Sequence, residues 1–218
     1  MRLPLYHVVQ HLLERQRRRA DDRALRAELG HFQLEAAVRK GVQRALPRLG
    51  RFVTELGAQA VPDSADFMEP ARWPDLDWER LERTHALQKA IFDRRVPPAE
   101  HPTFESWRAA TQDYQATVIR RQIEALRRIK YRPTGGFAQF MFADGHPAVS
   151  WSVLDHQRRP KAGFHALAEA CRPVIVTADR LPADMIVGDT HAVDVHVVSD
   201  LREPVEGVEV VATLSWTG

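Results

Sequence analysis

Residues Arg51–Pro62 read RFVTELGAQAVP. Residues 52–54 are one aromatic and two β-branched residues, which favour a strand, and the run ends on Glu55, shortly before Gly57. A barrel enzyme presents a catalytic group in this way, on an acidic residue at the carboxyl end of a strand. By itself the pattern is weak, because most glutamates in such places are solvated. The rest of the chain decides how it is interpreted.

Two helical patterns follow this stretch. The first begins after Asp75 or Asp77, either of which can cap a helix, and ends near Val96, before two prolines. The second is the longest in the chain and begins at Thr103 or Ser106. Apolar residues recur on the predicted inward faces. They are Trp78, Leu81, Leu87 and Ile91 in the first helix, and Trp107, Ala110, Tyr114, Val118, Ile123 and Leu126 in the second.

A second strand is predicted after these helices. Residues 133–136 read Pro-Thr-Gly-Gly, a turn sequence, and Phe137–Phe142 is a nearly continuous apolar run. Such a run is typical of a strand buried on both faces. The order strand, helix, helix, strand predicts an α/β fold, either a barrel or a doubly wound sheet.

After Cys171 the hydrophobic pattern changes to a period of two. Valines alternate with polar residues around 174–176, 193–197 and 208–216. This alternation predicts the beginning of a β-sandwich, since three strands are fewer than the roughly seven such a domain needs.

The N-terminal part differs in charge from the rest. Residues 1–48 carry eleven Arg and Lys against five Asp and Glu, whereas the other 170 residues carry twenty against twenty-four. Helical spacing of apolar residues predicts helices over 4–29 and over Phe32–Ala45. The arginine-rich run at 15–19 could bind nucleic acid or an acidic protein, but it lacks interleaved aromatic residues, so a solvated helix face is favoured.

Composition excludes several classes of protein. Hydrophobic residues make up 44% of the 218, enough for a core, and no apolar run approaches the roughly 20 residues of a membrane span. The single cysteine, Cys171, excludes a disulfide framework and indicates a reducing compartment, so we expect a cytoplasmic protein. His7 and His11 are one helical turn apart but lack the glutamate of a zinc-protease helix, so we expect neither metal nor cofactor.

The segment Gly135–Leu167, GGFAQFMFADGHPAVSWSVLDHQRRPKAGFHAL, resembles the last barrel strand and following loop of β-mannosidases in glycoside hydrolase family two. The matching positions are Asp144, Pro147, Ser150-Trp151-Ser152, Asp155 and Arg159-Pro160-Lys161. About ninety residues upstream, RFVTELGAQAVP resembles the penultimate-strand motif of that family, whose glutamate is the nucleophile. The resemblance carries that role to Glu55.

The resemblance implies a chain truncated at both ends. Residues 47–172 would form the last two strands of a TIM (β/α)8 barrel with their helices, and 173–218 the first strands of an immunoglobulin-like β-sandwich. Residues 1–46 would be a basic helical segment without a counterpart in the family. Phe140, Asp144 and Trp151 would bind substrate. Phe140 stands where the family has a tryptophan, and Ala143 where it has an asparagine, so the sugar preference could be altered.

The function implied is hydrolysis of terminal β-linked sugars with retention of configuration. Retaining glycosidases use two carboxyl groups about 5–5.5 Å apart, one as nucleophile and one as acid/base. In the family the acid/base glutamate follows an asparagine, and this sequence contains no asparagine. We therefore expect the isolated chain to be inactive. The alternatives are a noncatalytic remnant or an interaction protein that binds a partner through residues 1–46, and a remnant that does not fold stably.

Overall fold

The computed structural model describes residues 7–9, 51–131, 134–179 and 190–213. The chain divides into two compact units, one of residues 24–170 and one that joins residues 1–23 with 171–218. The division falls after Ala170, against a predicted boundary after residue 172. Helices and strands mix in the larger unit, which agrees with the predicted α/β class.

Two parallel strands organise the larger unit. Strand β2 (Phe52–Leu56) pairs with β3 (Gly136–Gln139), and the predicted strand at 51–55 is thereby confirmed. Parallel strands need a long crossover, which helices commonly provide. Here the crossover contains α4 (Trp78–His85), α5 (Lys89–Arg95) and α6 (Phe104–Arg128), and α7 (Ala162–Ala170) follows β3. Short 3-10 turns lie at Asp66–Met68, Pro70–Arg72 and Pro98–Glu100.

Helix α4 begins where a cap was predicted, but the single helix expected to reach Val96 is wrong. The Asp77 side chain accepts a hydrogen bond from the Arg80 N–H, which caps α4. The helix then ends at His85, before Ala86, whose φ of 57° is left-handed, and α5 starts after Gln88. Buried Gln59 explains the break, because its amide donates to the Gln88 carbonyl at 3.1 Å and accepts from the Gln88 N–H at 3.0 Å.

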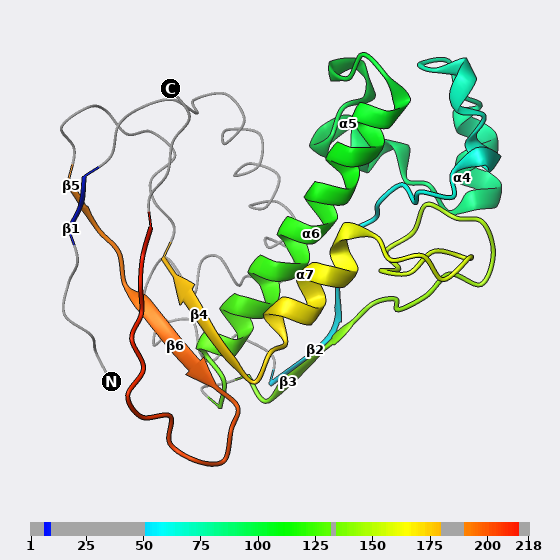
Figure 1. The fold of residues 1–218 in the computed structure, drawn as a ribbon. Coiled ribbons are helices and arrows are strands. Elements are labelled where there is room, and N and C mark those ends of the chain that lie inside the picture. The colour runs from blue at the N-terminus through cyan, green and yellow to red at the C-terminus, as the bar shows by residue number, and fades with distance from the viewer. Residues whose placement is uncertain (1–6, 10–50, 132–133, 180–189, 214–218) are drawn as a thin grey trace. The chain divides into compact units, whose positions relative to one another are not determined.

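Helix α6 is the longest described element, and its predicted start is confirmed. Thr103 and Ser106 form a reciprocal capping box, in which each side chain accepts from the other's backbone N–H. The helix lies beside α7, as Figure 1 shows in green and yellow. Its inward face contributes more buried apolar side chains to the core than any other described helix or strand. Those fully or nearly fully buried are Phe104, Trp107, Val118, Ile119, Ile123 and Leu126.

Strand β3 is shorter and less buried than predicted. It ends at Gln139, its four residues are only partly buried, and Phe140 and Phe142 are 42% and 57% exposed. The expectation of a strand buried on both faces is therefore wrong here. The reason is structural: among the described residues β3 has one neighbouring strand, β2, and the two form a two-stranded sheet.

The described part of the smaller unit contains strands. β4 (Val174–Ala178) pairs antiparallel with β6 (Val195–Ser199), and β1 (His7–Val9) pairs antiparallel with β5 (Thr190–Ala192). The alternation in β4 is confirmed, since Ile175 and Thr177 are buried while Val176 is exposed.

Two predictions fail in this unit. Residues 7–9 form a strand, so the helix predicted over 4–29 is wrong there, and β-branched Val8 and Val9 suit a strand. Residues 208–213 form no strand, and Val208 and Val211 are exposed. The alternating segment therefore pairs with no strand among the described residues. The remaining residues of 1–46, including His11 and the arginine run, lie outside the described residues.

None of the helices in the described ranges is both long enough and apolar enough to cross a membrane.

Candidate active site

Glu55, the predicted nucleophile, lies near the carboxyl end of β2 in a β-bulge. Two residues of β2, Thr54 and Glu55, stand opposite one residue of β3, Ala138. Bulges of this kind redirect side chains and recur beside active sites. Both Thr54 and Glu55 are exposed, and the Glu55 carboxylate makes no hydrogen bond or ion pair with any residue the structure describes. The carboxylate is therefore accessible to a ligand.

Gly57 brings the end of this strand against two other predicted site residues. Its φ of +140° is one that residues with a side chain rarely adopt. A Cβ added here would lie 2.9 Å from the Phe140 carbonyl oxygen and 3.4 Å from the Trp151 ring. Glu55, Phe140 and Trp151 thus come from segments that meet at one edge of the β2–β3 pair.

Phe140 and Trp151 form an aromatic pair at this edge. Their ring centroids are 6.1 Å apart and the rings are nearly perpendicular, at 80°. Phe140 is exposed and Trp151 is half-buried, so the pair keeps apolar surface open to solvent. A cis peptide bond joins Phe140 to Met141.

The segment that follows β2, residues 57–61, is buried without regular secondary structure, so its backbone polar groups need partners. Polar side chains from the inward face of α6 supply them. The bonds are Gly57 N–H to Gln122 Oε1 (3.2 Å), Gln115 Nε2 to the Ala58 carbonyl (2.8 Å), Val61 N–H to Thr111 Oγ1 (3.1 Å) and Gln112 Nε2 to the Val61 carbonyl (3.1 Å). Helix α6 thereby fixes where the Glu55 strand ends.

Asp144, the third predicted substrate ligand, is buried, with 3% of its surface exposed. One carboxylate oxygen accepts hydrogen bonds from Ser150 Oγ at 2.5 Å and from Ser152 Oγ at 2.8 Å. These two serines flank Trp151, so Asp144 holds the backbone on both sides of that ring. A contact between Asp144 and a sugar stays a prediction; the contacts seen give it a supporting role.

Lys161 is the buried cation of this site, at 1% exposure. Its Nζ lies 3.6 Å from Asp144 Oδ2 and donates to the Ala60 carbonyl at 3.2 Å and the Ser150 carbonyl at 3.4 Å. Burial lowers the pKa of Lys161 to about 8, and the nearby Asp144 carboxylate opposes that shift.

Asp155, the last carboxylate of the matching motif, is held by Ser64 and by the backbone of its own loop. Its oxygens accept from Ser64 Oγ at 2.6 Å and from the backbone N–H groups of Gln157 and Arg159 at 2.8 and 2.9 Å. Burial alone would raise the pKa of Asp155, but these hydrogen bonds outweigh it and lower the pKa below its ordinary value.

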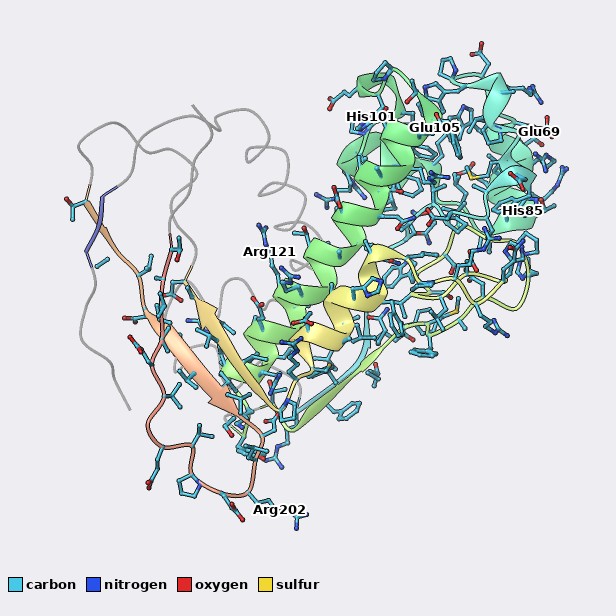
Figure 2. All side chains as sticks on the ribbon, in the orientation of Figure 1. Glu69, His85, His101, Glu105, Arg121 and Arg202 are labelled. Atoms are coloured by element: carbon cyan, nitrogen blue, oxygen red, sulfur yellow. The ribbon has the colours of Figure 1, made fainter. Side chains whose placement is uncertain are left out.

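A more exposed polar group lies around α4. Arg80 bonds Glu69 at 3.0 Å and approaches His85 Nε2 at 3.3 Å, and Figure 2 shows Glu69 and His85 on this side of the larger unit. The other ring nitrogen of His85 is 2.7 Å from the Pro147 carbonyl, which ties α4 to the loop that carries Asp144. Partly exposed ion pairs of this kind contribute little to stability.

One group in the described part of the chain has metal-ligand chemistry. Potential ligand atoms of Asp179, Asp194 and His196, at the ends of β4 and β6, lie within 4.8 Å of one another. Partly exposed clusters like this are common at protein surfaces without an ion, so we assign no metal to it.

Sequence patterns identified Glu55, Phe140 and Trp151, which the structure brings to one edge, but missed the polar residues of α6. A signal for those residues exists. Thr111, Gln115 and Gln122 occur at helical spacing among the buried apolar positions of α6, where polar side chains need a specific partner.

Comparisons with known proteins agree with the resemblance carried by these motifs. No protein-family model matches the chain. It is 31% identical to β-mannosidase A of Aspergillus terreus over 127 residues, which is 56% of this chain and 13% of that protein. It is 28% identical to β-mannosidase B of Aspergillus niger over 176 residues, 72% of this chain and 20% of that protein.

Among solved structures, a β-D-mannosidase from Dictyoglomus thermophilum matches 62% of this chain and 18% of its own, with a TM-score of 0.49 and 22% identity. The chain therefore spans about a fifth or less of the length of these relatives. Part of this chain resembles part of a β-mannosidase.

Proposed function

We propose that this chain carries the nucleophile of a retaining, β-mannosidase-like glycoside hydrolase, and that the nucleophile is Glu55. The observation that supports this most directly is the position of Glu55. Its carboxylate is exposed, has no partner among the residues the structure describes, and lies in a bulge at the carboxyl end of a strand, where the active sites of (β/α)8 barrel enzymes are built. In this reaction the carboxylate attacks the anomeric carbon, the glycosidic bond breaks, and water later hydrolyses the resulting ester.

The fold supports a barrel assignment for these strands. β2 and β3 are parallel, helices connect them, and a further helix, α7, follows β3. We take them as the last two strands of a (β/α)8 barrel, and β4 and β6 as the first strands of an immunoglobulin-like sandwich. The alternative, an interaction protein that uses basic helices in residues 1–46, finds no support in the only described part of that segment, which is strand β1.

The sugar would lie against the aromatic pair. Phe140 and Trp151 offer apolar surface beside the end of β2, on which the C–H face of a pyranose can rest. Phe140 occupies the position where the resemblance implies a tryptophan, so this wall is smaller than in the family. A terminal β-linked mannoside, or a related sugar, is the proposed substrate class.

The second carboxyl group is the part that this sequence lacks, since the asparagine that precedes the acid/base of the family occurs nowhere in it. The acid protonates the departing oxygen, so its absence matters most for poor leaving groups. We expect the 218-residue protein alone to leave simple aryl β-mannosides intact. Their turnover, abolished by Glu55→Gln, would contradict this expectation.

A substrate whose leaving group needs no protonation tests Glu55 directly. With 2-deoxy-2-fluoro-β-mannosyl fluoride, Glu55 would form an ester with C1 as the C–F bond breaks and fluoride departs. Tandem mass spectrometry should find one fluorosugar on Glu55. Glu55→Gln should abolish the label, and Glu79→Gln, which removes an exposed carboxylate on α4, should not change it. A label at another residue, or none, would contradict the proposal.

A further inference from the structure

Lys161 and Asp144 form an ion pair in the interior of the larger unit, with 1% and 3% of their surfaces exposed. Charged groups are rarely buried to this degree unless they are paired, because removal from water is costly for each of them. On the surface, both residues would have stayed hydrated. The pair therefore calls for an explanation beyond general stability.

The ammonium of Lys161 joins two segments that are far apart in the sequence. It donates to the carbonyl of Ala60, in the segment that leaves β2, and to that of Ser150, in the loop after β3. It also lies 3.6 Å from the Asp144 carboxylate. A direct backbone bond, Ala60 N–H to the Ser150 carbonyl at 3.1 Å, runs beside these contacts. One cation thus holds the end of the Glu55 strand against the Ser150–Ser152 loop.

The carboxylate of Asp144 extends the connection to an aromatic ring. The oxygen that does not face Lys161 accepts from both Ser150 and Ser152, and the Ser152 N–H in turn donates to Ser150 Oγ at 2.9 Å. Trp151 is the residue between these serines. Its own carbonyl accepts from Gln115 and Gln139, both at 3.3 Å, so its backbone is held from several sides while its ring reaches the site edge.

We propose that Lys161 and Asp144 are positioning residues, whose buried ion pair orients the Trp151 ring beside the end of the Glu55 strand. The consequence for sugar binding rests on the proposed function; the consequence for the Trp151 ring does not. Neither Lys161 nor Asp144 needs to touch the sugar in this role.

The charge of Lys161 makes the arrangement dependent on pH. The acidic groups that act on it are Asp144, at contact distance, and Asp155, which is held in turn by Ser64. Because burial lowers the pKa of Lys161 to about 8, the ammonium loses its proton near that pH, where free lysine keeps it. The bonds to Ala60 and Ser150 are then weakened, and Trp151 should respond in the same pH range.

Fluorine NMR of the full chain labelled with 5-fluorotryptophan tests this without any sugar. Trp151→Phe assigns the Trp151 signal among those of the five tryptophans. In the wild type we expect this signal to shift with a midpoint near pH 8. In Lys161→Met the titration should disappear, and in Asp144→Asn the signal should move at neutral pH.

A matched control is available on the surface. Lys89 forms an exposed ion pair with Asp93 and lies over the Trp78 ring, 5.2 Å from its centroid. Lys89→Met should therefore move the Trp78 signal and leave that of Trp151 in place. If either buried variant fails to fold, the wild-type titration alone decides the matter.

A Trp151 signal that is constant from about pH 7 to 9 in the wild type would overturn the proposal, as would an unchanged signal in folded Lys161→Met. The fluorosugar experiment gives a separate readout. If Glu55 is labelled, Lys161→Met should slow labelling several-fold at low sugar concentration. If Glu55 is never labelled while Trp151 titrates as expected, the proposed function fails and the positioning role stands.

Discussion

Replacement of Gly57 by alanine tests the geometry on which the candidate site depends. Gly57 follows Glu55 by two residues and has φ of +140°. A residue with a side chain held in such a region costs about 1–3 kcal/mol. The new Cβ would also stand 2.9 Å from the Phe140 carbonyl oxygen and 2.8 Å from Gln139 Nε2. Overpacking of this kind costs about 1–3 kcal/mol more.

The two costs together predict a loss of about 4 kcal/mol in the free energy of unfolding for Gly57→Ala. That is a large part of the 5–15 kcal/mol that holds a typical domain together. Urea unfolding followed by tryptophan fluorescence measures it, and the melting temperature should fall by roughly 8–16 °C. The Phe140 backbone cannot move away easily, because its N–H donates to the Leu56 carbonyl at 2.9 Å.

Gly145→Ala is the matched control, because no atom lies within 4 Å of a Cβ built at that position. It should change the free energy of unfolding by no more than about 0.5 kcal/mol. If the free energies of unfolding of Gly57→Ala and Gly145→Ala differ by less than about 1 kcal/mol, the close approach between the end of β2 and Phe140 is wrong. The approach of the end of the Glu55 strand to the aromatic pair would then be wrong as well.

Three further outcomes follow from the hydrogen bonds. Gln115→Leu removes a buried donor shared by three carbonyls, at 2.8, 3.1 and 3.3 Å, and should lower the free energy of unfolding in urea by about 3 kcal/mol. The control Gln157→Leu, at an exposed position, should change it very little. Equal losses in the two variants would contradict the role of Gln115. The pKa of Asp155 is lowered in the folded protein, so its carboxylate stabilises the fold above the ordinary pKa of aspartate, and this stabilisation is lost as the pH falls below about 4. Ser64→Ala should make stability less sensitive to acid, because it removes one of the hydrogen bonds that lower this pKa. An unchanged pH profile of the urea midpoints would contradict this prediction. Asp77→Ala removes the cap of α4 and should lower the free energy of unfolding in urea by about 1 kcal/mol; an unchanged value would show that the cap does not stabilise the helix.

Elements set by local chemistry were predictable from the sequence. The strand at 52–56 follows from its aromatic and β-branched residues, and α6 begins where Thr103 and Ser106 allow a capping box. Elements set by tertiary contacts were not. The break at Ala86 depends on Gln59, a residue 27 positions earlier, whose amide bonds the backbone at Gln88.

The candidate site shows the same division. The sequence motifs identified Glu55, Phe140 and Trp151 by position, and they also included Asp144 and Lys161. A sequence motif does not show, however, whether a carboxylate is exposed or buried. The structure separates them, since Glu55 is exposed in a bulge and Asp144 is paired in the interior. The strand predicted from alternation over 208–213 is absent for a related reason. A strand needs the backbone of a neighbouring strand as its hydrogen-bond partner.

The hold that α6 has on residues 57–61 bears on how this site could be redesigned. The side chains of Phe140 and Thr54, near the end of β2, are exposed, while the side chains that hold residues 57 and 58 lie on a helix more than fifty residues later in the sequence. No hydrogen bond in the described residues joins the side chains of the two sets, so their substitutions should combine nearly additively. A library that varies Phe140 and Thr54 while it keeps Gln115 and Gln122 constant can therefore change the exposed surface near Glu55 without loosening the strand that carries it.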